Sequence, residues 1–125
     1  MKILAVTSEL YPLIKTGGLA DVAGALPAAL APEGLDVTTL VPGYPVAMKG
    51  LTATQVVQRF ENLQGGAAKV VAGKAYGLNL LVLDAPHLFG RGGNPYLGSD
   101  GKDWPDNGQR FGALSQVAAL LGREQ

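Results

Sequence analysis

The chain has 125 residues, no cysteine and a single histidine, and its ten basic and ten acidic residues leave a formal net charge of zero. This length can bury the core of one domain, while the missing cysteines exclude disulfides and thiolate catalysis, and one histidine excludes a multi-histidine metal centre. The balanced charge argues against nucleic acid or an anionic membrane as a partner, and no apolar run approaches the roughly 20 residues of a membrane span, so we expect a cytoplasmic protein.

The first part of the chain predicts a strand, a helix and a second strand. Residues 3–7 are aliphatic and β-branched, as in the central strand of a parallel sheet. Apolar residues recur at helical spacing over residues 19–30, where Pro27 is expected to kink the helix or loosen one turn. Residues 36–41 predict the second strand, and residues 42–45 a rigid turn. These elements form a right-handed, parallel βαβ unit.

The second part predicts three further strands, a long loop and a final helix. The strands cover residues 55–60, 69–75 and 78–84, and the last is the most apolar and therefore central. Residues 86–105 form a polar loop, which in compact domains is usually functional or disordered. Asp106 is expected to cap the final helix, with a glutamine three residues on as its capping-box partner. The buried face of this helix is expected to comprise Phe111, Leu114, Val117, Ala118 and Leu121.

The most informative segment is the loop between the first strand and the first helix, Lys15-Thr16-Gly17-Gly18. Adjacent glycines let backbone N–H groups approach a ligand closely, and the helix N-terminus adds a positive dipole. The lysine adds a full charge, and the loop follows the carboxyl end of a strand, where open α/β sheets bind ligands. The segment therefore predicts an anion site, although a glycine turn followed by a solvated lysine is about equally favoured by position alone.

Other polar and aromatic residues give weaker signals. Asp21 lies in the first helical turn, where the dipole stabilises a carboxylate, so helix-end electrostatics and sugar binding both explain it. Glu9 is expected at the surface, with bonding to sugar hydroxyls or orientation of the lysine as the alternative. His87 is expected to be structural rather than catalytic. Tyr96 and Trp104 either stack on a sugar or a base or anchor the long loop, and anchoring is slightly favoured for Trp104.

Three familiar motifs do not fit. The loop after the first strand is too long for a dinucleotide fingerprint, and the second strand ends without an acidic residue. Gly73-Lys74-Ala75 lacks the hydroxyl and the spacing of a P-loop. The aspartates of residues 100–106 do not form a calcium loop, because Lys102 occupies a ligand position and no glutamate closes the loop. We therefore expect no cofactor and no metal.

Several separated blocks of this chain resemble, in the same order, the N-terminal signature of bacterial glycogen synthases and plant starch synthases. The first blocks are Glu9, Lys15 to Val22 and Gly24 to Pro27. The later blocks are Leu40 to Pro45, Asp84 to Phe89, Gly93 to Tyr96, Asp103 to Asn107 and Arg110-Phe111. The resemblance covers essentially the whole chain.

The resemblance implies a retaining glycosyltransferase of the GT-B type that transfers glucose from ADP-glucose to the non-reducing end of an α-1,4-glucan such as glycogen. It implies that Lys15 contacts the phosphates and glucose of the donor, and that the backbone of Gly17 and Gly18 approaches the donor. Asp21 and Tyr96 match positions near the cleft. The substrate-binding residues expected from the resemblance are Lys15, Thr16, Gly17, Gly18, Asp21 and Tyr96, and no catalytic residue is expected within the chain.

The resemblance also implies the fold and the domain organisation. We expect an α/β fold, a Rossmann-like open sheet with a parallel core and helices on both faces, that forms the N-terminal part of the first GT-B domain. Residues 1–125 are then an incomplete portion of the catalytic domain, with the second GT-B domain absent, and the chain is expected to be inactive alone. The alternatives are another GT-B glycosyltransferase with a different donor or acceptor, and a non-catalytic sugar-binding stub.

Overall fold

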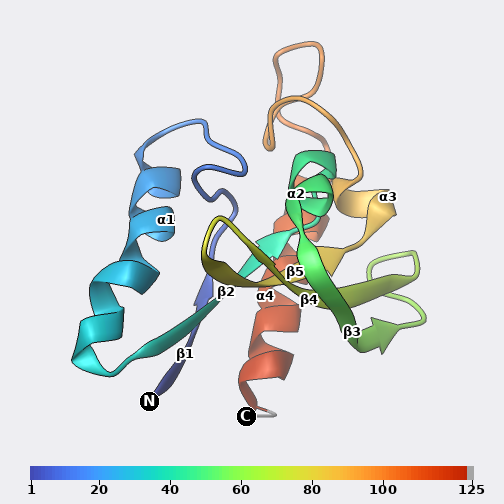
Figure 1. Cartoon of the computed structure of the whole chain (residues 1–125). Helices are drawn as coiled ribbons and strands as arrows, with labels where there is room; N and C mark the ends of the chain where they lie inside the picture. Colours follow the sequence, from blue (N-terminus) through green and yellow to red (C-terminus); the bar gives the residue numbers. More distant parts are fainter. Residues whose placement is uncertain (124–125) are drawn as a thin grey trace.

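A five-stranded sheet organises the computed structural model, which describes residues 1–123 (Figure 1). The strands are β1 (Lys2–Val6), β2 (Asp36–Pro42), β3 (Thr52–Phe60), β4 (Ala68–Ala75) and β5 (Leu78–Asp84). Their spatial order is β1-β2-β5-β4-β3, with β1, β2 and β5 parallel and β4 and β3 added antiparallel. The parallel core and the central position of β5 were both predicted from the sequence, and both are confirmed.

Helices cover both faces of this sheet, because its central strands are apolar on both sides. The helices are α1 (Gly18–Leu30), the 3₁₀ turn η1 (Ala31–Glu33), α2 (Pro45–Gly50), α3 (Pro86–Phe89) and α4 (Asn107–Arg123). Val41, Leu80 and Val82 form one core with residues of α1, α2 and the loop before α1. Leu40 and Leu83 point to the opposite face and form the other core with α3 and α4. The expected Rossmann-like architecture is therefore confirmed.

Two short helices were not predicted. Helix α2 begins at Pro45, the last residue of the expected turn, and α3 lies inside the segment that was expected to be a loop. Such short helices do not repeat an apolar face often enough for a 3.6-residue period to be detected. Helix α1 runs through Pro27 as one element.

Strand β1 has a single neighbour among the described residues. The sequence predicts a central strand, and within residues 1–123 this strand pairs with β2. Its middle residues, Ile3 to Ala5, are consequently only half-buried, with α4 packed against the strand. An apolar run indicates coverage of both faces of a strand, but it does not report how many neighbours the strand has.

The carboxyl ends of the three parallel strands meet at one edge of the sheet, at the top of Figure 1. The loop of residues 7–17 (blue) and the loop of residues 90–106 (orange) both stand above this edge. In open α/β folds this is where ligands bind. Among residues 1–123, no helix has the length and the apolar character needed to cross a membrane.

Candidate functional site

The loop between β1 and α1 is anchored by its own backbone. Leu10 and Ile14 exchange two N–H···O bonds of 2.9 Å, and the N–H of Tyr11 donates to the carbonyl of Ala20 at 3.0 Å. Gly24 of α1 lets the loop approach, because a Cβ there would lie 2.5 Å from the carbonyl oxygen of Tyr11. The glycine loop is therefore held at a fixed position against the first turns of α1.

The carboxylate of Glu9 lies beneath the glycine loop and is 2% exposed. Its Oε1 accepts the N–H groups of Thr16 at 3.0 Å and Gly17 at 3.1 Å, and its Oε2 accepts the hydroxyls of Thr16 at 2.6 Å and Tyr96 at 2.5 Å. The expectation that Glu9 lies at the surface is wrong, because the loop folds back over this side chain. Burial raises the pKa of Glu9, but the hydrogen bonds lower it by more, to about 2.

Tyr96 joins the loop of residues 90–106 to the Glu9 carboxylate. Its hydroxyl also shares a 2.7 Å hydrogen bond with the Ser8 hydroxyl, and the Tyr44 hydroxyl donates to the Ser8 carbonyl at 2.8 Å. The Tyr96 ring lies 5.7 Å from that of Phe111 on α4. Burial, and then the hydrogen bond to Glu9, raise the pKa of Tyr96, and burial also raises that of Tyr44. Both phenols therefore stay protonated, as hydrogen-bond donors.

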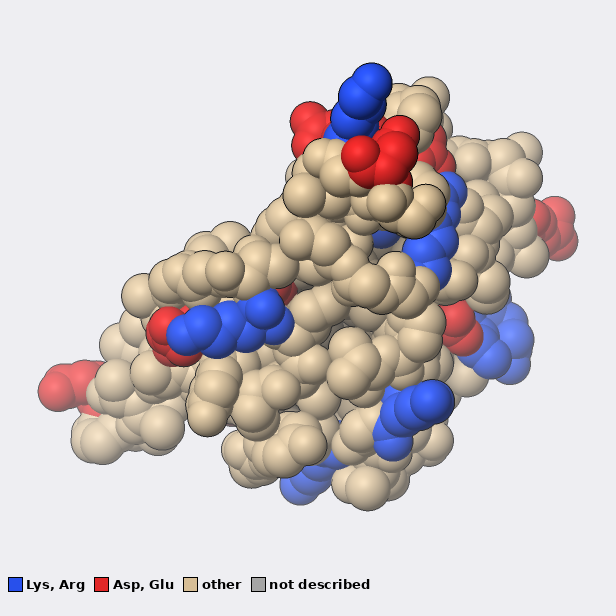
Figure 2. Space-filling model, turned by 90° about the horizontal axis from the view of Figure 1, so that it is seen from above, with Lys and Arg blue, Asp and Glu red and all other residues tan. Residues whose placement is uncertain are grey.

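Lys15 and Asp21 lie at the exposed mouth of the same loop. The Lys15 ammonium is 2.5 Å from a carboxylate oxygen of Asp21, the side chains are 45% and 50% exposed, and the ammonium lies 5.9 Å from the centre of the Tyr11 ring. An ion pair this exposed contributes little to stability, so an anionic ligand can replace Asp21 at low cost. Figure 2 shows this upper face with separated charges of both signs and no continuous basic patch.

All the sequence-predicted site residues are thus brought together. Lys15 to Gly18 and Asp21 share one loop and one helical turn, and Tyr96 reaches them through Glu9. Glu9 is the residue whose importance sequence reasoning underestimated. The available signal was a carboxylate placed just after a buried strand and just before a segment rich in backbone donors.

A buried arginine, which the sequence did not reveal as buried, holds the loop of residues 90–106 in place. Arg110 of α4 is 1% exposed, and its guanidinium donates to the carbonyl of Leu88 at 2.6 Å, the carbonyl of Pro95 at 2.9 Å and the side chain of Asn107 at 2.8 Å. It therefore fixes the backbone directly before Tyr96. Nothing in the spacing of the sequence distinguishes this arginine from a solvated residue of the helix.

Asp106 has a different partner from the one expected. It directly precedes α4, but its carboxylate accepts two hydrogen bonds from Arg91, at 2.8 and 2.6 Å, which lower the pKa of Asp106. The Arg91 guanidinium lies 4.7 Å from the centre of the Trp104 ring, in agreement with the anchoring interpretation of that residue. His87 bonds the Leu63 carbonyl at 2.7 Å, in agreement with a structural role.

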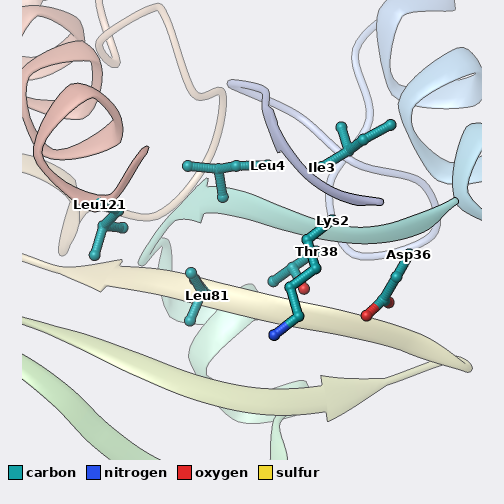
Figure 3. Close-up of a pocket in the computed structure, with 7 residues that line it drawn as sticks. All are labelled: Lys2, Ile3, Leu4, Asp36, Thr38, Leu81 and Leu121. Atoms are coloured by element: carbon teal, nitrogen blue, oxygen red, sulfur yellow. The ribbon is translucent and has the colours of Figure 1, made fainter. Parts of the chain in front are cut away.

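A cavity of about 270 Å³ lies at the opposite end of the strands from the glycine loop. Figure 3 shows Leu4, Leu81 and Leu121 on one side of it and the ends of Lys2 and Asp36 on the other. Its mainly aliphatic lining offers few donors to a charged ligand. The glycine loop, with the ammonium of Lys15 and the N–H groups that begin α1, is therefore the better anion site. Within residues 1–123, no three His, Asp or Glu side chains gather as metal ligands would.

Comparison with known proteins places this geometry in a family. A family model described as the starch synthase catalytic domain matches residues 2–125. A glycogen synthase of Rhodopseudomonas palustris (strain TIE-1) is 59% identical over 123 residues, which are 98% of this chain and 26% of that protein. Glycogen synthase 2 of Bradyrhizobium diazoefficiens is 54% identical over 121 residues, which are 97% of this chain and 25% of that protein.

A solved structure shows the same fold. It is the catalytic domain of starch synthase IV from Arabidopsis thaliana bound to ADP and acarbose, with a TM-score of 0.72 and 23% identity over 98% of this chain and 25% of that chain. This chain therefore spans about a quarter of the length of the relatives it matches.

Proposed function

Because the chain belongs to the family of starch synthase catalytic domains, we propose that it forms one wall of the active site of a glycogen synthase. The proposed reaction transfers glucose from ADP-glucose to the non-reducing end of an α-1,4-glucan, in the cytoplasm. The observation that carries the proposal is the anion site at the carboxyl edge of the sheet. There the Lys15 ammonium stands beside the free N–H groups of the first turn of α1.

The proposed chemistry explains why an anion site is needed. As the bond between the glucose C1 and the diphosphate oxygen breaks, negative charge accumulates on the departing ADP. Fixed N–H groups at Gly18 and Leu19 and the ammonium of Lys15 stabilise that charge without reorganising. When Lys15 pairs with the diphosphate, Asp21 is released and can accept hydrogen bonds from sugar hydroxyls.

The rest of the active site is proposed to lie outside this chain. The relatives are about four times as long, so we propose that residues 1–125 are the N-terminal portion of a two-domain GT-B enzyme. The second domain then supplies the opposite wall, including the groups that select the nucleotide base. The chain is expected to be inactive alone, because one wall cannot enclose the donor.

A chimera tests this proposal directly. The chain replaces the matching segment of the Rhodopseudomonas palustris glycogen synthase, and glucose transfer to glycogen is measured with ADP-glucose and with UDP-glucose. We expect transfer from ADP-glucose, and we expect Lys15→Ala to lower kcat/KM at least about a hundredfold through lost stabilisation of the leaving group. Lys74→Ala, which removes an exposed lysine on β4, is the matched control and should leave kcat/KM unchanged.

Two results would contradict the proposal. A correctly folded chimera without transfer from ADP-glucose would show that this segment cannot serve a glycogen synthase. Full activity in the Lys15→Ala variant would show that the donor is held elsewhere.

A further inference from the structure

We propose that Glu9 is a positioning residue of the donor site: its buried carboxylate sets which backbone N–H groups of the glycine loop face the ligand, and Tyr96 locks it in place. This inference rests on the proposed function, because it names what holds the proposed site in its binding geometry. Glu9 acts through Thr16 and Gly17 and is not proposed to touch the donor.

The first observation is that Glu9 has no capacity left for a ligand. Each of its two oxygens accepts two hydrogen bonds, all between 2.5 and 3.1 Å, and the residue is 2% exposed. A carboxylate offers about four acceptor positions, so these four donors fill it. A direct role in binding sugar hydroxyls, the alternative considered from the sequence, would require this network to break.

The second observation is that Glu9 performs half of a capping box from outside the helix. Gly17 is the N-cap of α1, has extended backbone angles (φ −161°, ψ −160°) and has no side chain with which to cap. In a capping box, a Glu or Gln at the third helical position bonds the N-cap N–H, but here that position holds Ala20. Glu9 bonds the Gly17 N–H instead, which fixes the direction in which α1 begins.

As a consequence, some N–H groups of the loop bond Glu9 and others remain for the ligand. Those of Thr16 and Gly17 point inward to Glu9, so the donors of the first turn that are left without a helical acceptor are those of Gly18, Leu19 and Ala20. By bonding Thr16 and Gly17, the Glu9 carboxylate fixes the backbone between Lys15 and the first turn of α1, and so fixes how these donors are placed relative to one another. Without the Glu9 carboxylate, the N–H groups of Thr16 and Gly17 would be free to bond the ligand, and the loop would lose its fixed conformation.

The third observation is that Tyr96 is itself rigid. Its N–H donates to the Asn94 side chain at 2.8 Å, and its carbonyl accepts the Asn107 side-chain amide at 2.9 Å and the Trp104 N–H at 3.1 Å. The Tyr96 hydroxyl therefore connects Glu9 to the start of α4. Through the bond between Tyr96 and Glu9, the glycine loop keeps a fixed position relative to α4, which is far away in the sequence.

The test uses Glu9→Gln, Tyr96→Phe and the double variant, in the full 125-residue chain and in the chimera. Glu33→Gln, an exposed glutamate in η1, is the matched control for loss of one charge. In the chain, amide hydrogen exchange at residues 16 and 17 is compared with exchange in α4. In the chimera, KM for ADP-glucose, KM for glycogen and kcat are measured separately.

We expect Glu9→Gln to raise exchange at residues 16 and 17 and KM for ADP-glucose about tenfold each, because charge-assisted hydrogen bonds are replaced by neutral ones. Exchange in α4 and KM for glycogen should stay unchanged, which a general loss of structure would not produce. Tyr96→Phe should act in the same direction but less strongly. The double variant should be no worse than Glu9→Gln, because the two groups act through one another.

Two results would overturn the inference while leaving the proposed function intact. In one, the wild-type chimera is active and Glu9→Gln changes neither loop exchange nor KM for ADP-glucose. In the other, Glu9→Gln and Tyr96→Phe both lower kcat and raise both KM values, and they raise exchange in α4 as much as in the loop. An inactive wild-type chimera would instead refute the proposed function, and the exchange of residues 16 and 17 in the chain would still decide whether Glu9 orders the loop.

Discussion

At the scale of single residues, the site consists of charges that the chain compensates internally. Lys15 is paired with Asp21 at the surface, whereas Glu9 is compensated by neutral donors in the interior. The exposed pair is cheap to break and suits a group that must exchange partners when a ligand binds. The buried carboxylate is costly to disturb and suits a group that must keep its geometry.

The first prediction at this scale concerns pH. The pKa of Glu9 is about 2 in the folded chain against its usual 4.5, so the folded state favours the ionised carboxylate. That preference is fully present above pH 4.5 and is lost as the pH falls from 4.5 to 2, and at neutral pH it corresponds to about 3 kcal/mol. Urea unfolding at pH values from about 2.5 to 7 should show the wild type losing more stability on acidification than Glu9→Gln.

The comparison with Glu9→Gln isolates this residue, because other carboxylates with lowered pKa values, such as Asp106, are present in both proteins. Parallel pH profiles for the two proteins would show that the Glu9 hydrogen bonds do not favour the ionised form.

At the scale of elements, the site depends on how closely α1 packs against the loop before it. Gly24 creates that contact, because any side chain there would meet the backbone of Tyr11 rather than a flexible group. The loop of residues 90–106 is held differently, by the guanidinium groups of Arg91 and Arg110 bonded to carboxylate and carbonyl oxygens. Backbone contact fixes one half of the site, and two guanidinium groups, one of them buried, fix the other.

The prediction at this scale is that Gly24→Ala destabilises the chain. The added Cβ would lie 2.5 Å from the Tyr11 carbonyl oxygen, which must move α1 away from the loop at a cost of about 1–3 kcal/mol. Gly112→Ala is the matched control, because a Cβ at this position of α4 meets no atom within 4 Å and alanine favours a helix by up to about 1 kcal/mol. Thermal unfolding should therefore separate the two variants in opposite directions, and a Gly24→Ala variant as stable as the wild type would contradict the contact.

At the scale of the whole molecule, the sequence predicted the elements with strong local patterns. The periodic recurrence of apolar residues and the positions of turn residues predicted the four strands from β2 to β5, the βαβ unit and the buried face of α4. Both signals are properties of neighbouring positions. The glycine loop was located in the same way. Asp106 directly precedes α4, as predicted, but the predicted cap is wrong, because its carboxylate bonds Arg91 instead of the start of the helix.

The features that were missed depend on contacts between distant positions. Glu9 looks like a surface residue until residues 16–17 and Tyr96 close over it, and Arg110 looks solvated until the carbonyls of residues 88 and 95 converge on it. Helices α2 and α3 are too short to show a period.

The measurement that tests the central claim most directly is an NMR titration of the ¹⁵N-labelled 125-residue chain with ADP. If the glycine loop holds the diphosphate, saturable shifts will be concentrated at the amides of residues 15–21, will disappear in Lys15→Ala and will persist in Lys74→Ala. Shifts centred on the cavity beside Lys2 and Leu4, or shifts that survive in Lys15→Ala, would contradict the assignment of this loop as the donor site.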